Sequence, residues 1–110
     1  MQGPYEAGSA ASPFAPTAES WESRHGLVRG TRYSVAKAFS DADGDVHHIG
    51  DKWKFLGATF SKFDDEVVIS ISREDGKDWK IPLIWKSQKQ AEIIEQILTY
   101  ITPEQVNLRR

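Results

Sequence analysis

Carboxylates that could do chemistry are concentrated in residues 40–51 of the chain. Asp41, Asp43 and Asp45 alternate with other residues, and their oxygens could coordinate a hard cation such as calcium. The pattern fails the EF-hand test, because Gly44 follows directly after the second aspartate and no flanking pair of helices is expected. We therefore interpret the segment as an acidic turn, and we predict no metal site and no cofactor.

Two histidines follow the aspartates at once. His47 and His48 are adjacent, so in an extended segment their rings face opposite ways and cannot both ligate one ion. Together with Asp51 or His25 they give at best a weak indication of zinc.

Residues suited to catalysis do not form a recognisable set. The serines of residues 67–72 alternate with apolar side chains and are expected on a solvent-facing side. Asp64 and Asp65 lie at an expected turn, where solvent keeps both carboxylates ionised and general acid work is disfavoured. No nucleophile elbow or phosphate loop is found, and we predict that the protein is not an enzyme.

Lysines and tryptophans are adjacent at residues 52–54, 79–80 and 85–86. Such a pattern can bind single-stranded nucleic acid, because tryptophan rings stack on bases and lysines contact phosphates. If the tryptophans face the core, however, the lysines point to the opposite side and no stacking platform exists. Nucleic-acid binding is therefore an alternative rather than the preferred interpretation. Its candidate residues are Lys52, Lys54, Lys80 and Lys86.

The composition describes one folded domain. The chain has 110 residues, 39% of them hydrophobic and 27% charged, with a formal net charge of −2 and no cysteine. The absence of cysteine suits a reducing compartment, so we expect a cytoplasmic location. No window approaches the roughly 20 apolar residues that span a bilayer, and we expect no membrane association.

Apolar residues recur at every second position between residues 30 and 85, which is the period of half-buried strands. The four predicted strands cover residues 32–39, 52–60, 67–72 and 79–85. In the second strand the apolar parity changes at Gly57, which predicts a bulge or a sharp bend. In the fourth strand, Pro82 has no backbone N–H to donate to a neighbouring strand. This predicts that the strand lies at an edge, contains a bulge or marks the place where a barrel opens.

A helix is predicted after the strands. Ser87 and Gln90 match a capping box, a wide apolar face follows, and Thr102 with Pro103 ends the helix. We predict a flexible tail over residues 1–26, a folded domain over residues 27–103 and a second tail over residues 104–110. Within the first tail, Trp21 lies close enough to the first strand for a short turn of helix to fold back over the sheet.

The glycines and aromatics of these strands carry a resemblance to a known family. The motifs are Gly30-x-x-Tyr33-x-Val35, Phe39-x-Asp41-x-Asp43-Gly44, Gly50-x-x-Trp53-x-Phe55-x-Gly57, and Asp75-Gly76 before Ile81-x-Leu83. Over residues 27–100 the chain resembles a small bacterial family of SH3-like β-barrel domains of unknown function. The resemblance implies a mainly β fold with one C-terminal helix: a small antiparallel barrel of four to five strands, closed by an amphipathic helix. It implies no activity and no catalytic residues.

The preferred function is a protein-interaction module of a bacterial protein, which presents acidic loops and a barrel edge to another protein. The predicted binding residues are Asp41, Asp43, Asp45, His47, Asp51, Asp64 and Asp65. One alternative is an immunity or inhibitor protein that neutralises a basic toxin surface. The other is the single-stranded nucleic-acid binder already described. We expect a monomer or a weak dimer.

Overall fold

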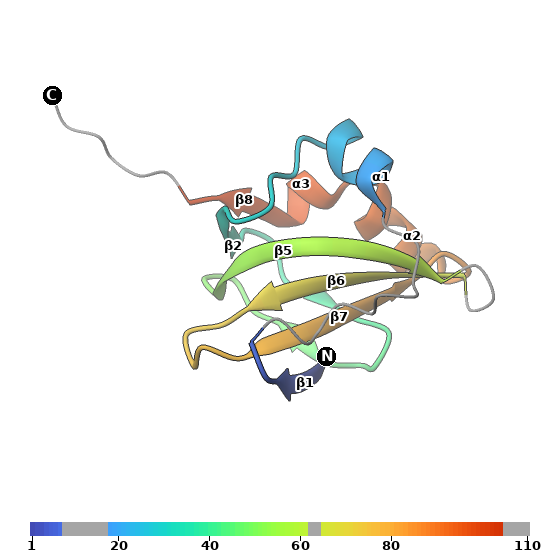
Figure 1. The fold of residues 1–110 in the computed structure, drawn as a ribbon. Helices are drawn as coiled ribbons and strands as arrows, with labels where there is room; N and C mark the ends of the chain where they lie inside the picture. Colours follow the sequence, from blue (N-terminus) through green and yellow to red (C-terminus); the bar gives the residue numbers. More distant parts are fainter. Residues whose placement is uncertain (8–17, 62–64, 105–110) are drawn as a thin grey trace, which may run out of the picture.

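The computed structural model describes residues 1–7, 18–61 and 65–104 of the chain (Figure 1). Its strands are β1 (Gln2–Tyr5), β2 (Arg32–Val35), β3 (Phe39–Ser40), β4 (Val46–His47), β5 (Lys52–Ser61), β6 (Glu66–Ser72), β7 (Asp78–Ile84) and β8 (Ile101–Pro103). Its helices are α1 (Glu19–Arg24), α2 (Gln88–Glu95) and α3 (Ile97–Tyr100). Among these residues, no helix has both the length and the apolar character that crossing a bilayer requires.

Six strands form one antiparallel sheet in the order β1-β7-β6-β5-β2-β8, and β3 pairs with β4 in a separate hairpin. The prediction of a closed SH3-like barrel is therefore wrong. Within the described residues β1 and β8 are the two edges of the sheet and do not pair with each other. The three short helices gather on one side of the curved sheet (Figure 1), and they bury apolar side chains that the barrel prediction had assigned to its interior.

The bulge predicted at Gly57 is confirmed. The register of β5 against β6 shifts between Phe55 and Gly57, and Gly57 has a φ of +142°, which favours glycine. Pro82 lies on β7 beyond the residues that pair with β1, and its carbonyl accepts a hydrogen bond from the Ala42 N–H at 2.8 Å. Pro82 has no backbone N–H to donate, and β1 does not extend to this position, so β1 needs no donor from it.

The predicted C-terminal helix is shorter than expected and is broken. Ser87 caps α2 by accepting from the Gln90 N–H at 3.4 Å, but the chain leaves helical geometry at Gln96 (φ −122°, ψ 42°) before α3 begins. The Gln90 side chain accepts from the Ile84 N–H at 2.9 Å instead of returning to the cap. Residues 101–103 then continue as β8 along β2, so the end of the predicted helix is a strand.

Two segments placed in the flexible N-terminal tail have regular structure. Residues 2–5 form β1, and residues 19–24 form α1, in which Trp21 is 1% exposed and covers the sheet as the sequence suggested. Glu22 fixes α1 to β5, because its buried carboxylate accepts two hydrogen bonds from Arg29 and one from the Ala58 N–H at 2.8 Å. The remainder of that predicted tail, residues 8–17, and residues 105–110 of the C-terminal tail lie outside the described residues.

Candidate protein-interaction site

The β3–β4 hairpin positions the aspartates of the acidic loop. Asp41 closes the turn by accepting hydrogen bonds at Oδ1 from the backbone N–H of Asp43 (2.9 Å) and of Asp45 (3.1 Å). Gly44 supplies the positive φ of +85° that the turn requires. These bonds turn all three side chains toward one point, so that one oxygen from each carboxylate lies within 4.8 Å of the others. We call this group, Asp41, Asp43 and Asp45, the acidic notch.

A cation of the chain itself lies in the acidic notch. The ammonium nitrogen of Met1 lies 2.7 Å from the Asp41 Oδ2, 3.1 Å from Asp43 and 2.5 Å from Asp45. Burial disfavours the charge, but the hydrogen bonds to the three carboxylates outweigh it and raise the pKa of this ammonium to about 10. The notch therefore holds the charged ammonium group of the chain's own first residue.

Asp41 is the buried floor of the notch, with 1% of its surface exposed. Burial alone would raise the pKa of its carboxyl, but the Met1 ammonium and His47 hold that pKa below its ordinary value. His47 lies 2.8 Å from Asp41 through Nε2 and stacks on Phe39 with ring centroids 4.8 Å apart. His47 is only 4% exposed and orients Asp41 in the described structure, and its role as a binding residue stays a prediction.

Of the other predicted acidic residues, Asp51 and Asp65 do not join the notch. Asp51 accepts from the His48 N–H at 3.1 Å and lines a separate hollow, and Asp65 precedes β6, where its carbonyl accepts from the Trp85 N–H. Asp64 lies outside the described residues. The structure thus brings together Asp41, Asp43 and Asp45, with His47 beneath them, and places Asp51 and Asp65 elsewhere.

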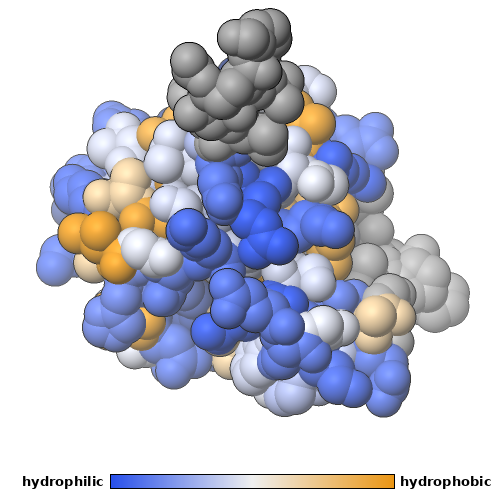
Figure 2. Space-filling view, turned by 90° about the vertical axis from the view of Figure 1, so that its left-hand side faces the viewer, coloured by the Kyte–Doolittle hydropathy of each residue, from blue (hydrophilic) through white to orange (hydrophobic). Residues whose placement is uncertain are grey.

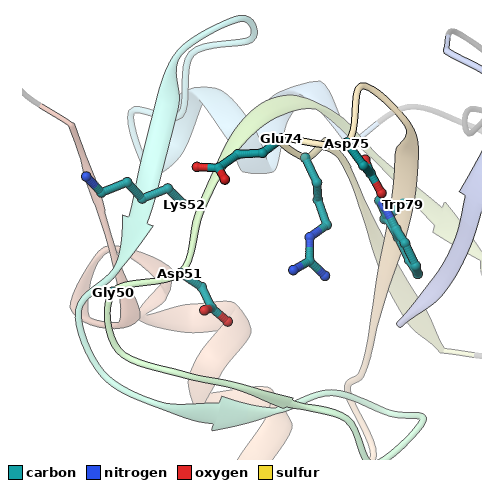
Figure 3. Close-up of a pocket in the computed structure, with 7 residues that line it drawn as sticks. Gly50, Asp51, Lys52, Glu74, Asp75 and Trp79 are labelled. Atoms are coloured by element: carbon teal, nitrogen blue, oxygen red, sulfur yellow. Dashed lines mark hydrogen bonds between the residues drawn. The ribbon is translucent and has the colours of Figure 1, made fainter.

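The separate hollow lies between the start of β5 and the β6–β7 turn and has a volume of about 580 Å³. Asp51 and Lys52 come from one side, and Glu74, Asp75 and Trp79 come from the other (Figure 3). Hydrophilic residues predominate on this end of the molecule (Figure 2). Its mixed charges are offset locally, since the Trp79 indole N–H donates to Asp75 at 3.2 Å and Arg73 lies over the indole ring at 5.4 Å.

The lysines of the nucleic-acid alternative lie along β5, on β7 and just after β7. Lys52 and Lys54 are exposed on β5, but the Trp53 between them is 2% exposed and belongs to the core. The Lys80 ammonium lies 5.3 Å from the centre of the Tyr5 ring, and Lys86 is exposed after β7. Of the tryptophans beside these lysines, Trp53 is buried, whereas Trp79 and Trp85 are half-buried.

No pattern in the sequence indicates that Met1 belongs to the site. Its ammonium reaches carboxylates more than forty residues away, and only pairing of β1 with β7 brings them together. A terminal amine carries no motif, and the first five residues lack the alternation that marks a strand. Their position follows from tertiary contacts alone.

Comparison with known proteins bears on the fold. No protein-family model matches the chain, and no curated protein matches it. Among solved structures, it is similar to integron cassette protein VCH_CASS4 from the mobile metagenome of Vibrio cholerae. The TM-score is 0.67, the identity is 23%, and the match covers 73% of this chain and 89% of that chain. At this identity the likeness shows a shared fold, and the resemblance to a bacterial family of unknown function stays a prediction.

The pKa of the Met1 ammonium predicts a pH dependence for the docking of β1. Because its value of about 10 in the folded chain exceeds the ordinary 8.0, the ammonium stabilises docking fully below pH 8, and this contribution is lost as pH rises through 10. Met1 is the single methionine of the chain, so its ¹³C-labelled methyl group reports on docking without ambiguity. We expect the methyl NMR signal to move toward the free-methionine position as pH rises from 8 through 10.

The matched control is the same chain with an acetylated N-terminus, which lacks the ammonium charge and keeps every side chain near β1, including Lys77, Lys80 and Tyr5. Its methyl signal should be that of a free methionine at every pH. A docked signal in the acetylated chain, or a titration identical in the two chains, would contradict the role of the ammonium.

Proposed function

We propose that the protein is a non-enzymatic protein-interaction module whose acidic notch receives a positively charged group of another protein. The observation that carries the proposal is the Met1 ammonium, which lies between the carboxylates of Asp41, Asp43 and Asp45. A lysine side chain or an N-terminal amine of a partner offers the same three donors on the same compact charge.

The surroundings of the notch suit contact with a protein. Asp43 and Asp45 keep 38% and 56% of their side-chain surface exposed, so their charges reach solvent and can steer a basic partner. Val46 follows Asp45 directly as the first residue of β4 and is 50% exposed, and Ile49, beyond β4, is 69% exposed. Exposed apolar side chains beside a charged anchor supply the dry contact area that small polar sites lack.

The immunity or inhibitor role is the more specific version of this proposal. It requires a basic partner surface, and the notch would provide carboxylates already oriented by the turn, which lowers the cost of binding. The nucleic-acid alternative is less favoured, because acidic groups repel phosphate and Trp53 is buried.

The test is affinity capture from a lysate of the organism that encodes the chain, followed by identification of the retained proteins. We expect the wild-type chain to retain a protein that Asp43→Lys, Asp45→Lys loses at least tenfold. The matched control is Glu19→Lys, Glu95→Lys, which makes the same change in net charge at exposed helix positions and should retain that protein. Equal retention by the notch variant, or recovery of nucleic acid alone, would refute the proposal.

A further inference from the structure

The outer edge of β7 accepts an extended segment. There β1 pairs antiparallel, with Gln2 opposite Lys80 and Tyr5 opposite Asp78, and the register is irregular between these two pairs. Residues 2–4 are exposed and residue 5 is half-buried, so little apolar surface holds the strand between its ends. Such a strand opens more easily than the core strands of the same sheet.

The first residue, in contrast, is firmly recognised. The ammonium of Met1 lies in the acidic notch, and the Met1 side chain packs against the hydrophobic core. The Met1 Sδ lies 3.9 Å from a guanidinium nitrogen of Arg73. The notch contacts the backbone nitrogen itself, so an additional residue before the first would displace the charge from the carboxylates. The site therefore selects a free α-amino group together with an apolar first side chain.

The third residue is also selected. Gly3 has a φ of +139°, and a Cβ at this position would lie 2.9 Å from the Asp78 carbonyl oxygen and 2.9 Å from the Trp79 ring. Any side chain there meets backbone and a packed indole, so the strand must shift or leave. The three features define an extended segment with a free amine, an apolar first residue and a glycine in third place.

We propose that the β7 edge and the acidic notch together bind the free N-terminal segment of a partner protein, and that β1 occupies this site in the unbound chain. The inference rests on the proposed function and names the partner group: an α-ammonium followed by an extended backbone. Strand addition supplies main-chain hydrogen bonds, and the notch fixes the register.

A partner segment is favoured over β1 of a second copy. A second copy offers the same contacts as the chain's own β1 but has to be brought in from solution, whereas β1 is tethered through residues 6–17 and has a high effective concentration. The tethered strand therefore excludes an equivalent strand and raises the apparent dissociation constant of any competitor. A segment from outside therefore fills the site only if it binds more tightly than β1, or if β1 has already left.

The experiment uses the full chain with Gly3→Val, which expels β1 without altering the receiving surface. The probe is a synthetic peptide of residues 1–7, Met-Gln-Gly-Pro-Tyr-Glu-Ala, with a C-terminal fluorophore, and binding is measured by fluorescence anisotropy. We expect the peptide to bind Gly3→Val at least tenfold more tightly than it binds the wild-type chain. We also expect the N-acetylated peptide to bind Gly3→Val at least tenfold more weakly than the free peptide.

A second receptor, the wild-type chain acetylated at its own N-terminus, serves if Gly3→Val fails to fold. The Met1 methyl signal shows whether β1 has left in each case. Equal binding of free and acetylated peptides, equal binding to wild type and variant, or no binding to a chain whose β1 has left would overturn the inference. Dimerisation of the wild-type chain through exchange of β1 would also overturn it, since a second copy would then fill the site.

The notch variant separates this inference from the proposed function. Asp43→Lys, Asp45→Lys combined with Gly3→Val should lose the peptide, and Glu19→Lys, Glu95→Lys combined with Gly3→Val should keep it. If the peptide fails while lysate capture still depends on the notch, the proposed function stands and this inference fails. If capture from the lysate does not depend on the notch either, both the proposed function and this inference are refuted.

Discussion

Replacing Asp41 with alanine is expected to destabilise the folded chain by about 3 kcal/mol, because several donors lose their buried acceptor together. The carboxylate accepts from two backbone N–H groups of its turn, contacts His47 at 2.8 Å and holds the Met1 ammonium at 2.7 Å. For a domain of this size the melting temperature should fall by roughly 10–20 °C. Thermal unfolding followed by circular dichroism measures the change, and the Met1 methyl signal should report release of β1.

Two further variants separate the contributions of the exposed carboxylate, the buried charge and the backbone hydrogen bonds to this loss of stability. Asp45→Ala removes an exposed carboxylate whose side chain contacts only Met1 in the described structure, so it should cost less than about 1 kcal/mol. Asp41→Asn keeps an oxygen for the two backbone N–H groups but loses the charge, so it should release β1 while preserving most of the stability. A loss for Asp45→Ala as large as that for Asp41→Ala would contradict the buried role of Asp41.

The same carboxyl gives stability a dependence on acid. Because the pKa of Asp41 is lower in the folded chain than its ordinary 3.8, its contribution is present above that value and is lost as pH falls through the lower folded pKa. Docking of β1 is thus bounded on both sides: by protonation of Asp41 in acid and by deprotonation of the Met1 ammonium as pH rises from 8 through 10.

The acidic loop shows what residue types alone could indicate about the site. Their density and spacing correctly singled out Asp41, Asp43 and Asp45 as carboxylates that share one turn. The sequence did not indicate that Asp41 and His47 are buried or that Met1 completes the site, because burial and the docking of β1 depend on contacts far apart in the chain. A spacing pattern carries information about neighbours along the chain. It could not indicate Met1, because Met1 is distant from the notch in the sequence.

The fold shows the same division between local and distant information. Period-2 alternation located β5, β6 and β7 within about two residues, and the parity change located the bulge at Gly57. Alternation states that one face of each strand is buried but not what covers it, so it fits a closed barrel and a helix-covered open sheet equally well. The break at Gln96 was also hidden, because the apolar face of the predicted helix continues through α3 into Ile101 of β8.

Replacing Trp21 with alanine should destabilise the domain by about 3–5 kcal/mol, which is a large share of the stability of any small fold. The side chain is 1% exposed, and its indole N–H donates to the carbonyl of Ile94 at 3.0 Å, so it joins α1 to α2 across the covered face of the sheet. Its loss leaves a cavity and an unpaired carbonyl on α2. Chemical denaturation should show a lower midpoint for Trp21→Ala, with the Met1 methyl signal still docked wherever the variant remains folded.

Trp21→Phe is the matched control, because it keeps much of the ring volume and removes the donor. It should cost about 1–3 kcal/mol, so that the difference between the two variants measures the filled volume. Since Trp21 belongs to the helix layer and the notch belongs to the β3–β4 hairpin, Trp21→Phe should bind a notch partner as tightly as the wild-type chain. Near-wild-type stability of Trp21→Ala would mean that α1 does not pack on the sheet, and loss of partner binding by Trp21→Phe would mean that the interaction surface extends to α1.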